Sequence, residues 1–320
     1  MEPPYGVIWD CLRGGNVVPF LGAGTSLAGR PASWQAPNDE CLPDGKELAA
    51  FLAREASFPS TDEYDLRDLA KVSSYYEDVS GRPRLVSQLR KVFDFKFQPG
   101  EIHRLLANID VPQVIVVTNY DTLVEDAFIQ AKKPFDLVVY PCDRADFANA
   151  VMWWPHGEAE PRFEHANSLP IALPKTTVIF KMHGTIVRGQ EGWDNFVVTE
   201  DDYVDFLARM DSAVPKILMT HFRTRGFLFL GYSLRDWNLR VVLKNVSQHL
   251  LNRANKKNAI PSWAIQKSTS ELERLLWGKR NVSIFDMDLQ VFVQRLVEEK
   301  KRFEEEQQRL QEKRLKEQAG

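Results

Sequence analysis

Seven short apolar runs, each four or five residues long, limit the folds open to this chain more than any other feature. Nearly every position in them is apolar, which is typical of strands covered on both faces. Helical patterns lie between the runs, and strand, tight turn and helix in repetition predict a doubly wound α/β fold. We therefore expect a Rossmann-like, mostly parallel sheet built from residues 17–21, 114–118, 137–140, 177–180, 227–230, 262–265 and 282–285.

The remaining segments predict one large domain over residues 1–297, followed by a charged C-terminal helix over 298–320. Residues 30–110 are mostly helical and are expected to form a subdomain over the sheet. Residues 143–174 hold several prolines and little periodicity, which predicts an insertion or a long loop. Two interpretations of the charged helix stay open: an exposed helix end, or a weak coiled-coil arm. Further helices are expected at 45–56, 66–93 with a break near Gly81 and Pro83, 99–106, 121–131 and 235–251.

Composition excludes several classes of protein. The chain has 41 Lys and Arg against 44 Asp and Glu. The resulting net charge of −3 gives no chain-wide electrostatic attraction to nucleic acid or to an anionic membrane. No apolar run approaches the roughly 20 residues of a membrane-spanning helix, and the first ten residues lack the features of a signal peptide. Cys11, Cys41 and Cys142 include no C-x-x-C pair, which argues against a disulfide framework and a four-cysteine zinc site. We expect a cytoplasmic protein with no metal, no membrane contact and no direct contact with nucleic acid.

Four of the apolar runs end in glycine or polar residues. Glycines let a backbone approach a phosphate and adopt positive φ, amides can point at an anion, and an imidazole can act as a base near neutral pH. Because the carboxyl ends of parallel strands meet at one edge, we expect these groups to share one crevice. They are Gly22, Ala23, Gly24, Thr25 and Ser26 after the first run, Asn119 and Asp121 after the second, His183 and Gly184 after the fourth, and Gly231 and Ser233 after the fifth.

Each motif also has a plainer interpretation. Two glycines suit a tight strand-to-loop turn, and the pattern G-x-G-x-x-G fails because its third glycine position is Leu27. Taken alone, Asn119 or Asp121 is more often a helix cap, and a lone histidine at a strand end is more often structural. A glycine followed by Ser233 also suits a simple strand-to-helix loop. The predicted site therefore depends on the four motifs occurring together.

In this order the motifs resemble the sirtuin superfamily, whose pattern is a G-A-G-x-S loop, then N-x-D, then a catalytic H-G and then G-x-S. The phrases P-F-L-G-A-G-T-S, T-N-Y-D, K-M-H-G and F-L-G-Y-S-L-R-D are most similar to sirtuin-like proteins of bacterial anti-phage defence. The resemblance spans about residues 15–290. It implies that His183 is the general base, that Asn119 holds the nicotinamide ribose or a water, and that Asp121 contacts the nicotinamide carboxamide. The diphosphate and nearby ribose would then contact Gly22, Ala23, Gly24, Thr25 and Ser26, and the adenosine side would contact Gly231 and Ser233.

Two departures from the family narrow the implied activity. No cysteine lies between His183 and Gly231, where zinc-binding sirtuin deacetylases carry two cysteine pairs. The Phe-Arg motif of the family is also missing after the glycine loop, where Arg30 is the only arginine before Trp34. The resemblance thus implies an NAD glycohydrolase that forms nicotinamide and ADP-ribose and depletes NAD in anti-phage defence, with NAD as substrate. NAD-dependent protein deacylation, or binding of NAD or ADP-ribose without catalysis, stay open as alternatives.

Unregulated NAD hydrolysis would kill its host, so some gate is expected. Residues 143–174 and the charged C-terminal helix are the two segments where the sequence could provide it. We expect a homo-oligomer or a partner protein of a defence complex, and no residue of this chain identifies that partner.

Overall fold

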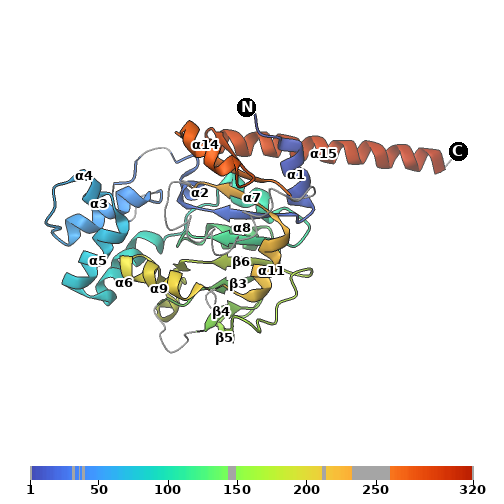
Figure 1. The fold of residues 1–320 in the computed structure, drawn as a ribbon. Helices are drawn as coiled ribbons and strands as arrows, with labels where there is room; N and C mark the ends of the chain where they lie inside the picture. Colours follow the sequence, from blue (N-terminus) through green and yellow to red (C-terminus); the bar gives the residue numbers. More distant parts are fainter. Residues whose placement is uncertain are drawn as a thin grey trace.

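The computed structural model describes residues 2–30, 33–35, 37, 40–142, 149–210, 214–232 and 260–318. Its centre is a nine-stranded sheet in the order β11-β10-β9-β1-β2-β6-β3-β4-β5 (Figure 1). All seven predicted runs form strands, and neighbours from β11 to β3 pair in parallel, as predicted. The strands are β1 (Val17–Leu21), β2 (Val114–Val117), β3 (Phe135–Val139), β4 (Ala150–Trp154), β5 (Arg162–His165), β6 (Thr177–Lys181), β9 (Gly226–Leu230), β10 (Ser262–Gln266) and β11 (Val282–Asp286), with a separate pair β7 (Gly184–Thr185) and β8 (Asn195–Phe196).

Helices cover both faces of the sheet. They are needed on both faces because successive strand residues, here mostly apolar, point to opposite sides of the sheet. Val18 and Phe20 belong to a core shared with α9, α11 and α14, whereas Val17 and Leu21 belong to a core shared with α1, α7, α8 and α15. This two-sided burial confirms the doubly wound class. The helices are α1 (Tyr5–Arg13), α2 (Ala23–Leu27), α3 (Gly45–Glu55), α4 (Glu63–Leu66), α5 (Leu69–Ser80), α6 (Arg82–Phe93), α7 (Glu101–Ala107), α8 (Leu123–Gln130), α9 (Glu200–Ala208), α11 (Lys216–Thr224), α14 (Glu271–Gly278) and α15 (Leu289–Gln318).

The segment 143–174 contains two strands that extend the sheet. β4 pairs antiparallel with β3, and β5 pairs antiparallel with β4. Trp153 is buried in this pairing, and its indole nitrogen donates to Asp136 Oδ2 at 3.2 Å. The run 150–154 is itself apolar, but prolines and little periodicity surround it, and the sequence therefore predicted an insertion or a long loop here.

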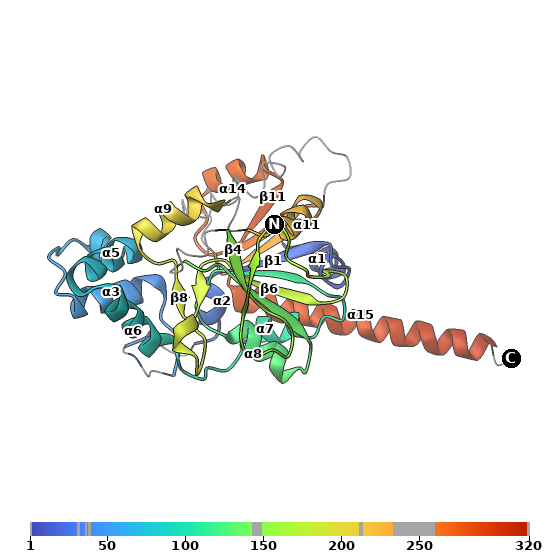
Figure 2. The ribbon, with the colours of Figure 1, turned by 90° about the horizontal axis from the view of Figure 1, so that it is seen from below.

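Residues 40–97, which we call the helical module, form a separate core beside the sheet. Helices α3, α5 and α6 bury apolar residues such as Leu52, Val72 and Leu89 against one another. The predicted break between α5 and α6 is confirmed at Gly81, which has φ of +81°. Helix α7 contributes instead to the core under the sheet. The module stands to one side of the sheet in both views (Figures 1 and 2).

Helix α15 is longer than the charged segment from which it was predicted. It begins at Leu289, and its first turns bury Phe292, Val293 and Leu296 in the core that contains α1. Arg13 covers the Phe303 ring at 4.0 Å from its centre. Beyond this contact the helix extends away from the sheet (Figures 1 and 2). Among the described residues no helix is both long and apolar enough to cross a membrane.

One row of paired residues explains where the four motifs lie. Leu21 pairs with Val117 on one side and with Leu230 on the other, and Val117 pairs in turn with Lys181. These residues are the last of β9, β1, β2 and β6. The segments that follow them therefore leave the sheet at the same level and on the same edge.

Candidate active site

A cavity of about 530 Å³ lies at this edge, and residues from all four motifs line it. Sequence-predicted site residues in its wall are Ala23, Gly24, Ser26, Asn119, Asp121, His183 and Gly231. Gly22 and Thr25 are buried behind the wall, and Ser233 is outside the described residues. A second cavity of similar volume adjoins it over the ends of β10 and β11 and shares Gly24 and Gly231. The two cavities lie side by side, with shared lining residues between them.

The glycines of the first motif are needed for contact between two loops. A Cβ on Gly24 would lie 2.6 Å from Gly231 Cα, and a Cβ on Gly231, which has φ of +68°, would lie 2.3 Å from the Thr25 nitrogen. The amides here are largely engaged: Gly22 N donates to Leu230 O, Gly24 N to Gly231 O and Thr25 N to Gly22 O, at 2.9–3.0 Å. These three amides do not point at an anion as expected, because they hold the turn in place. After Gly22 the turn continues as the short helix α2.

Asn119 and Asp121 brace the same turn from the neighbouring strand. Asn119 Nδ2 lies within donor distance of Gly22 O at 3.0 Å, Thr25 Oγ1 at 3.2 Å and Ser26 Oγ at 2.8 Å. Asp121 accepts from Ser26 Oγ at 2.7 Å with one carboxylate oxygen and from Leu123 N at 3.0 Å with the other. The second bond caps the start of α8, so the plainer interpretation of Asp121 holds in part. Both residues nevertheless face the cavity, although only 9% and 4% of their surfaces are exposed.

His183 is half-buried at the end of β6, and its ring faces the cavity. Tyr203 and Phe206 of α9 pack edge-on against the imidazole, with ring centres 5.4 and 5.7 Å away. Burial lowers the pKa of His183 to about 4, so the ring is neutral at pH 7 and can accept a proton. The next residue must be glycine: Gly184 has φ of +83°, and a Cβ there would lie 2.1 Å from Asn195 O.

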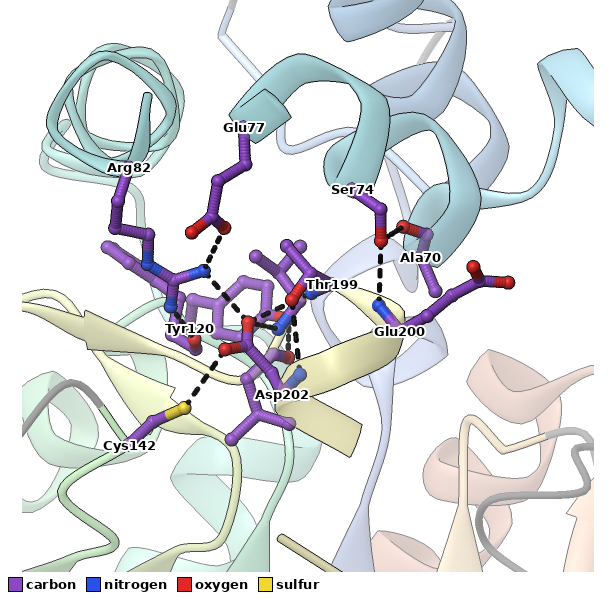
Figure 3. Close-up of polar contacts among 12 residues, drawn as sticks. Ala70, Ser74, Glu77, Arg82, Tyr120, Cys142, Thr199, Glu200 and Asp202 are labelled. Atoms are coloured by element: carbon purple, nitrogen blue, oxygen red, sulfur yellow. Dashed lines mark hydrogen bonds and ion pairs between the residues drawn. The ribbon is translucent and has the colours of Figure 1, made fainter. Parts of the chain in front are cut away.

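Polar contacts fix residues 196–202, which link β8 to α9, to the helical module (Figure 3). The Arg82 guanidinium at the start of α6 contacts Glu77 at 3.1 Å, Asp202 at 2.9 Å and the carbonyl of Phe196 at 2.5 Å. These ion pairs, together with bonds from two backbone amides, hold the pKa of Asp202 below its usual range despite its burial.

Tyr120 extends this link to the catalytic edge. Its hydroxyl donates to Val197 O at 2.6 Å (Figure 3), and Val197 N donates to the backbone oxygen of His183 at 2.9 Å. The module and the strand ends therefore form one continuous polar network, which keeps the two walls of the cavity at a set spacing.

The helical module supplies the second wall, which sequence reasoning missed. Tyr232, which follows the β9 strand end, also lines the cavity, and its hydroxyl donates to Thr118 Oγ1. Lys46 and Arg67 bring positive charge, which suits a substrate with phosphates. No motif marks these residues in the sequence, because they face the cavity only once the module has folded. The wall is formed by Leu42, Pro43, Asp44, Gly45, Lys46, Leu48, Arg67, Leu69 and Phe93.

In the part of the chain that the structure describes, no three His, Cys, Asp or Glu side chains are grouped closely enough to hold a metal ion. No disulfide joins Cys11, Cys41 and Cys142, all of which the structure describes. The contact of Cys142 is with Asp202, to which its sulfur donates at 3.4 Å (Figure 3).

Acid is expected to destabilise the protein through its buried imidazoles. Burial lowers the pKa of both His103 and His183 to about 4, from an ordinary 6.5. Between these values the unfolded chain binds protons that the native state excludes. Stability is therefore full above about pH 6.5 and falls as the pH drops towards 4.

His103→Asn tests this effect, since it keeps an acceptor for the Gly100 amide but removes one titrating ring. The urea midpoint of this variant should fall less than that of the wild type between about pH 7 and pH 5. An equal fall in the two proteins would contradict the assignment.

Fold and site together define the class of protein. Residues 113–285, more than half of the chain, match the family model of the SIR2-like domain, and the chain belongs to that family. This agrees with the order of the four motifs and with the doubly wound sheet.

Curated relatives extend the match to most of the chain. The NAD(+) hydrolase ThsA of Enterococcus faecium is 26% identical over 81% of this chain and 44% of the relative. The NAD(+) hydrolase ThsA of Bacillus cereus (strain MSX-D12) is 26% identical over 72% of this chain and 40% of the relative. Defense-associated sirtuin 2 of Bacillus subtilis is 24% identical over 74% of this chain and 20% of the relative. The chain thus spans less than half the length of these relatives.

Proposed function

We propose that the protein is an NAD glycohydrolase, which cleaves the bond between nicotinamide and ribose to give nicotinamide and ADP-ribose. The observation that carries this proposal is the single cavity lined by His183, Asn119, Asp121 and the glycine turn. The names of the relatives support the same reaction, and the name of the Bacillus subtilis relative supports a role in defence.

Each part of the cavity has a role in this proposal. The diphosphate lies against the turn 22–26, with charge supplied by Lys46 and Arg67, because most amides of the turn are engaged elsewhere. Asp121 contacts the nicotinamide carboxamide. Gly231 lines the adenosine side, where the second cavity offers space. The predicted contact of Ser233 on that side stays a prediction, because Ser233 lies outside the described residues.

His183 acts as the general base. Nicotinamide leaves as a neutral group, so the sugar develops oxocarbenium character with little need for an acid. The oxygen of a water attacks C1′ as the C1′–N bond breaks, and the water proton passes to the neutral imidazole, directly or through a ribose hydroxyl. Asn119 orients the water or the ribose through its free carbonyl side, since its amide nitrogen holds the turn.

The pH dependence of turnover should report the lowered pKa of His183. A base must be unprotonated to act, so kcat/KM should stay level from pH 8 down to about 5 and fall as the pH approaches 4. Initial rates in buffers of constant ionic strength measure this profile. A fall centred near pH 6.5 would show that the active base is not the buried ring.

Incubation of the purified protein with NAD, followed by chromatographic separation of the products, tests the function itself. The proposal expects nicotinamide and ADP-ribose without any further substrate. Release of nicotinamide only in the presence of an acylated peptide would identify a deacylase. Binding of NAD with no turnover would identify a binding module.

The domain division and the setting belong to the same proposal. The catalytic domain comprises residues 1–297, with the charged helix 298–320 appended to it. Three cysteines that form no disulfide support a reducing cytoplasm as its location. A homo-oligomer or a defence partner would gate the activity, and the extended part of α15 supports such a contact because it packs on no other described element beyond Phe303.

A further inference from the structure

Lys181 is a fully buried lysine at the end of β6, two residues before His183. None of its side chain is exposed. Such a group is costly to bury unless its charge is balanced and its donors are used. The groups around the Lys181 ammonium therefore indicate the role of this buried charge.

The ammonium group contacts two groups, both in the connection that follows β2. It donates to the backbone oxygen of Asp121 and lies 3.4 Å from Glu125 Oε1. Glu125 is 6% exposed, and neither of its carboxylate oxygens has a hydrogen bond with any described residue, so Lys181 is its partner in charge. Burial raises the pKa of Glu125 even though the neighbouring charge of Lys181 lowers it, so the pair gains less from its charges than its burial costs.

This ion pair is linked to the candidate site through Asp121. The Asp121 carbonyl that Lys181 holds belongs to the residue whose carboxylate accepts from Ser26 and caps α8. A chain of contacts thus runs from Glu125 through Lys181 and Asp121 to Ser26, across β6, β2 and β1. An apolar residue at position 181 could fill the same volume but could not hold the Asp121 carbonyl.

We propose that Lys181 is a positioning residue, which fixes the 119–121 loop against the glycine turn and so sets the shape of the NAD pocket, with Glu125 as its counter-charge. This inference rests on the proposed function. Buried ion pairs contribute little net stability compared with well-packed apolar pairs. The value of this one therefore lies in the geometry that it imposes.

The test separates stability from activity. Lys181→Met strands the Glu125 charge, so its melting temperature should fall strongly. The double variant Lys181→Met with Glu125→Met removes both charges and should regain most of that loss. Its kcat for NAD should still be reduced roughly tenfold to a hundredfold, because the Asp121 carbonyl is no longer held.

Arg225→Met is the matched control. It removes a half-buried cation that, like Lys181, donates to a backbone oxygen, here that of Gly15 at 2.7 Å, but Arg225 lies at the opposite edge of the sheet and does not line the candidate cavity. Its kcat and KM should match those of the wild type. Recovery of turnover together with the melting temperature in the double variant would overturn the proposal, because the pair would then be purely structural.

A separate readout keeps this test apart from that of the proposed function. If the wild type releases no nicotinamide, the proposed function fails, and affinity for ADP-ribose measured by calorimetry then decides the positioning role. The double variant should bind ADP-ribose roughly tenfold more weakly than the wild type or the Arg225→Met control. Equal affinity in all three proteins, or no binding by the wild type, would overturn the inference.

Discussion

His183→Ala should lose about 10²–10⁴-fold in the rate of NAD hydrolysis while keeping its fold. The imidazole faces the cavity, and its contacts with described residues are edge-on ring contacts with Tyr203 and Phe206, so its removal enlarges an existing space. We expect a small change in melting temperature and unchanged circular dichroism. Initial rates from chromatographic assays, at protein concentrations high enough to detect slow turnover, measure the effect.

His165→Ala provides the control for this variant. His165 is exposed on the edge strand β5, outside the residues that line the cavity. Its rate should equal that of the wild type. Hydrolysis at the wild-type rate by a folded His183→Ala protein would show that another group takes the proton.

Gly231→Ala should be the most damaging small substitution at the site. The added Cβ would lie 2.3 Å from the Thr25 nitrogen, in a backbone conformation with φ of +68°. Both the close contact and the conformation are unfavourable, so the free energy of unfolding should fall by roughly 2–5 kcal/mol. The displaced glycine turn should also weaken binding of ADP-ribose.

Gly157→Ala separates the two causes. Gly157 has φ of +85°, but a Cβ there would have nothing within 4 Å. This variant carries only the conformational cost, which is about 1 kcal/mol. Urea unfolding of both variants gives two losses in the free energy of unfolding, and the difference between them is the cost of disturbing the loop contact. Equal losses in the two proteins would mean that Gly24 and Gly231 do not need to approach so closely.

The sheet could be predicted because its signal is local. Each of the seven runs is short and apolar on both faces. This pattern can be recognised without knowing how the rest of the chain packs. The edge strand β5 lacks it, because Arg162–His165 is mostly polar. Strand β4 is apolar, but it lies in a segment with several prolines and little periodicity, which predicted a loop. Helices α9 and α11 were also missed, since each buries only one or two residues along nine.

The candidate site could be predicted only as far as the sheet geometry determines it. The pairing of Leu21 with Val117 and Leu230 brings the motifs to one edge, and the general rule for parallel sheets anticipates this. The engagement of the Gly24 amide by Gly231 depends on two loops 200 residues apart, for which the sequence carries no local signal. The sequence likewise carries no local signal that Lys46 lines the cavity, because its position there depends on how the helical module packs.

The most direct test of the central claim is a crystal structure of the His183→Ala variant with NAD, which the slow variant should retain intact. We predict the diphosphate against residues 22–26, the adenosine towards β10 and β11, and C1′ of the nicotinamide ribose beside position 183. NAD bound away from this cavity, or bound in it with C1′ turned away from position 183, would contradict the account.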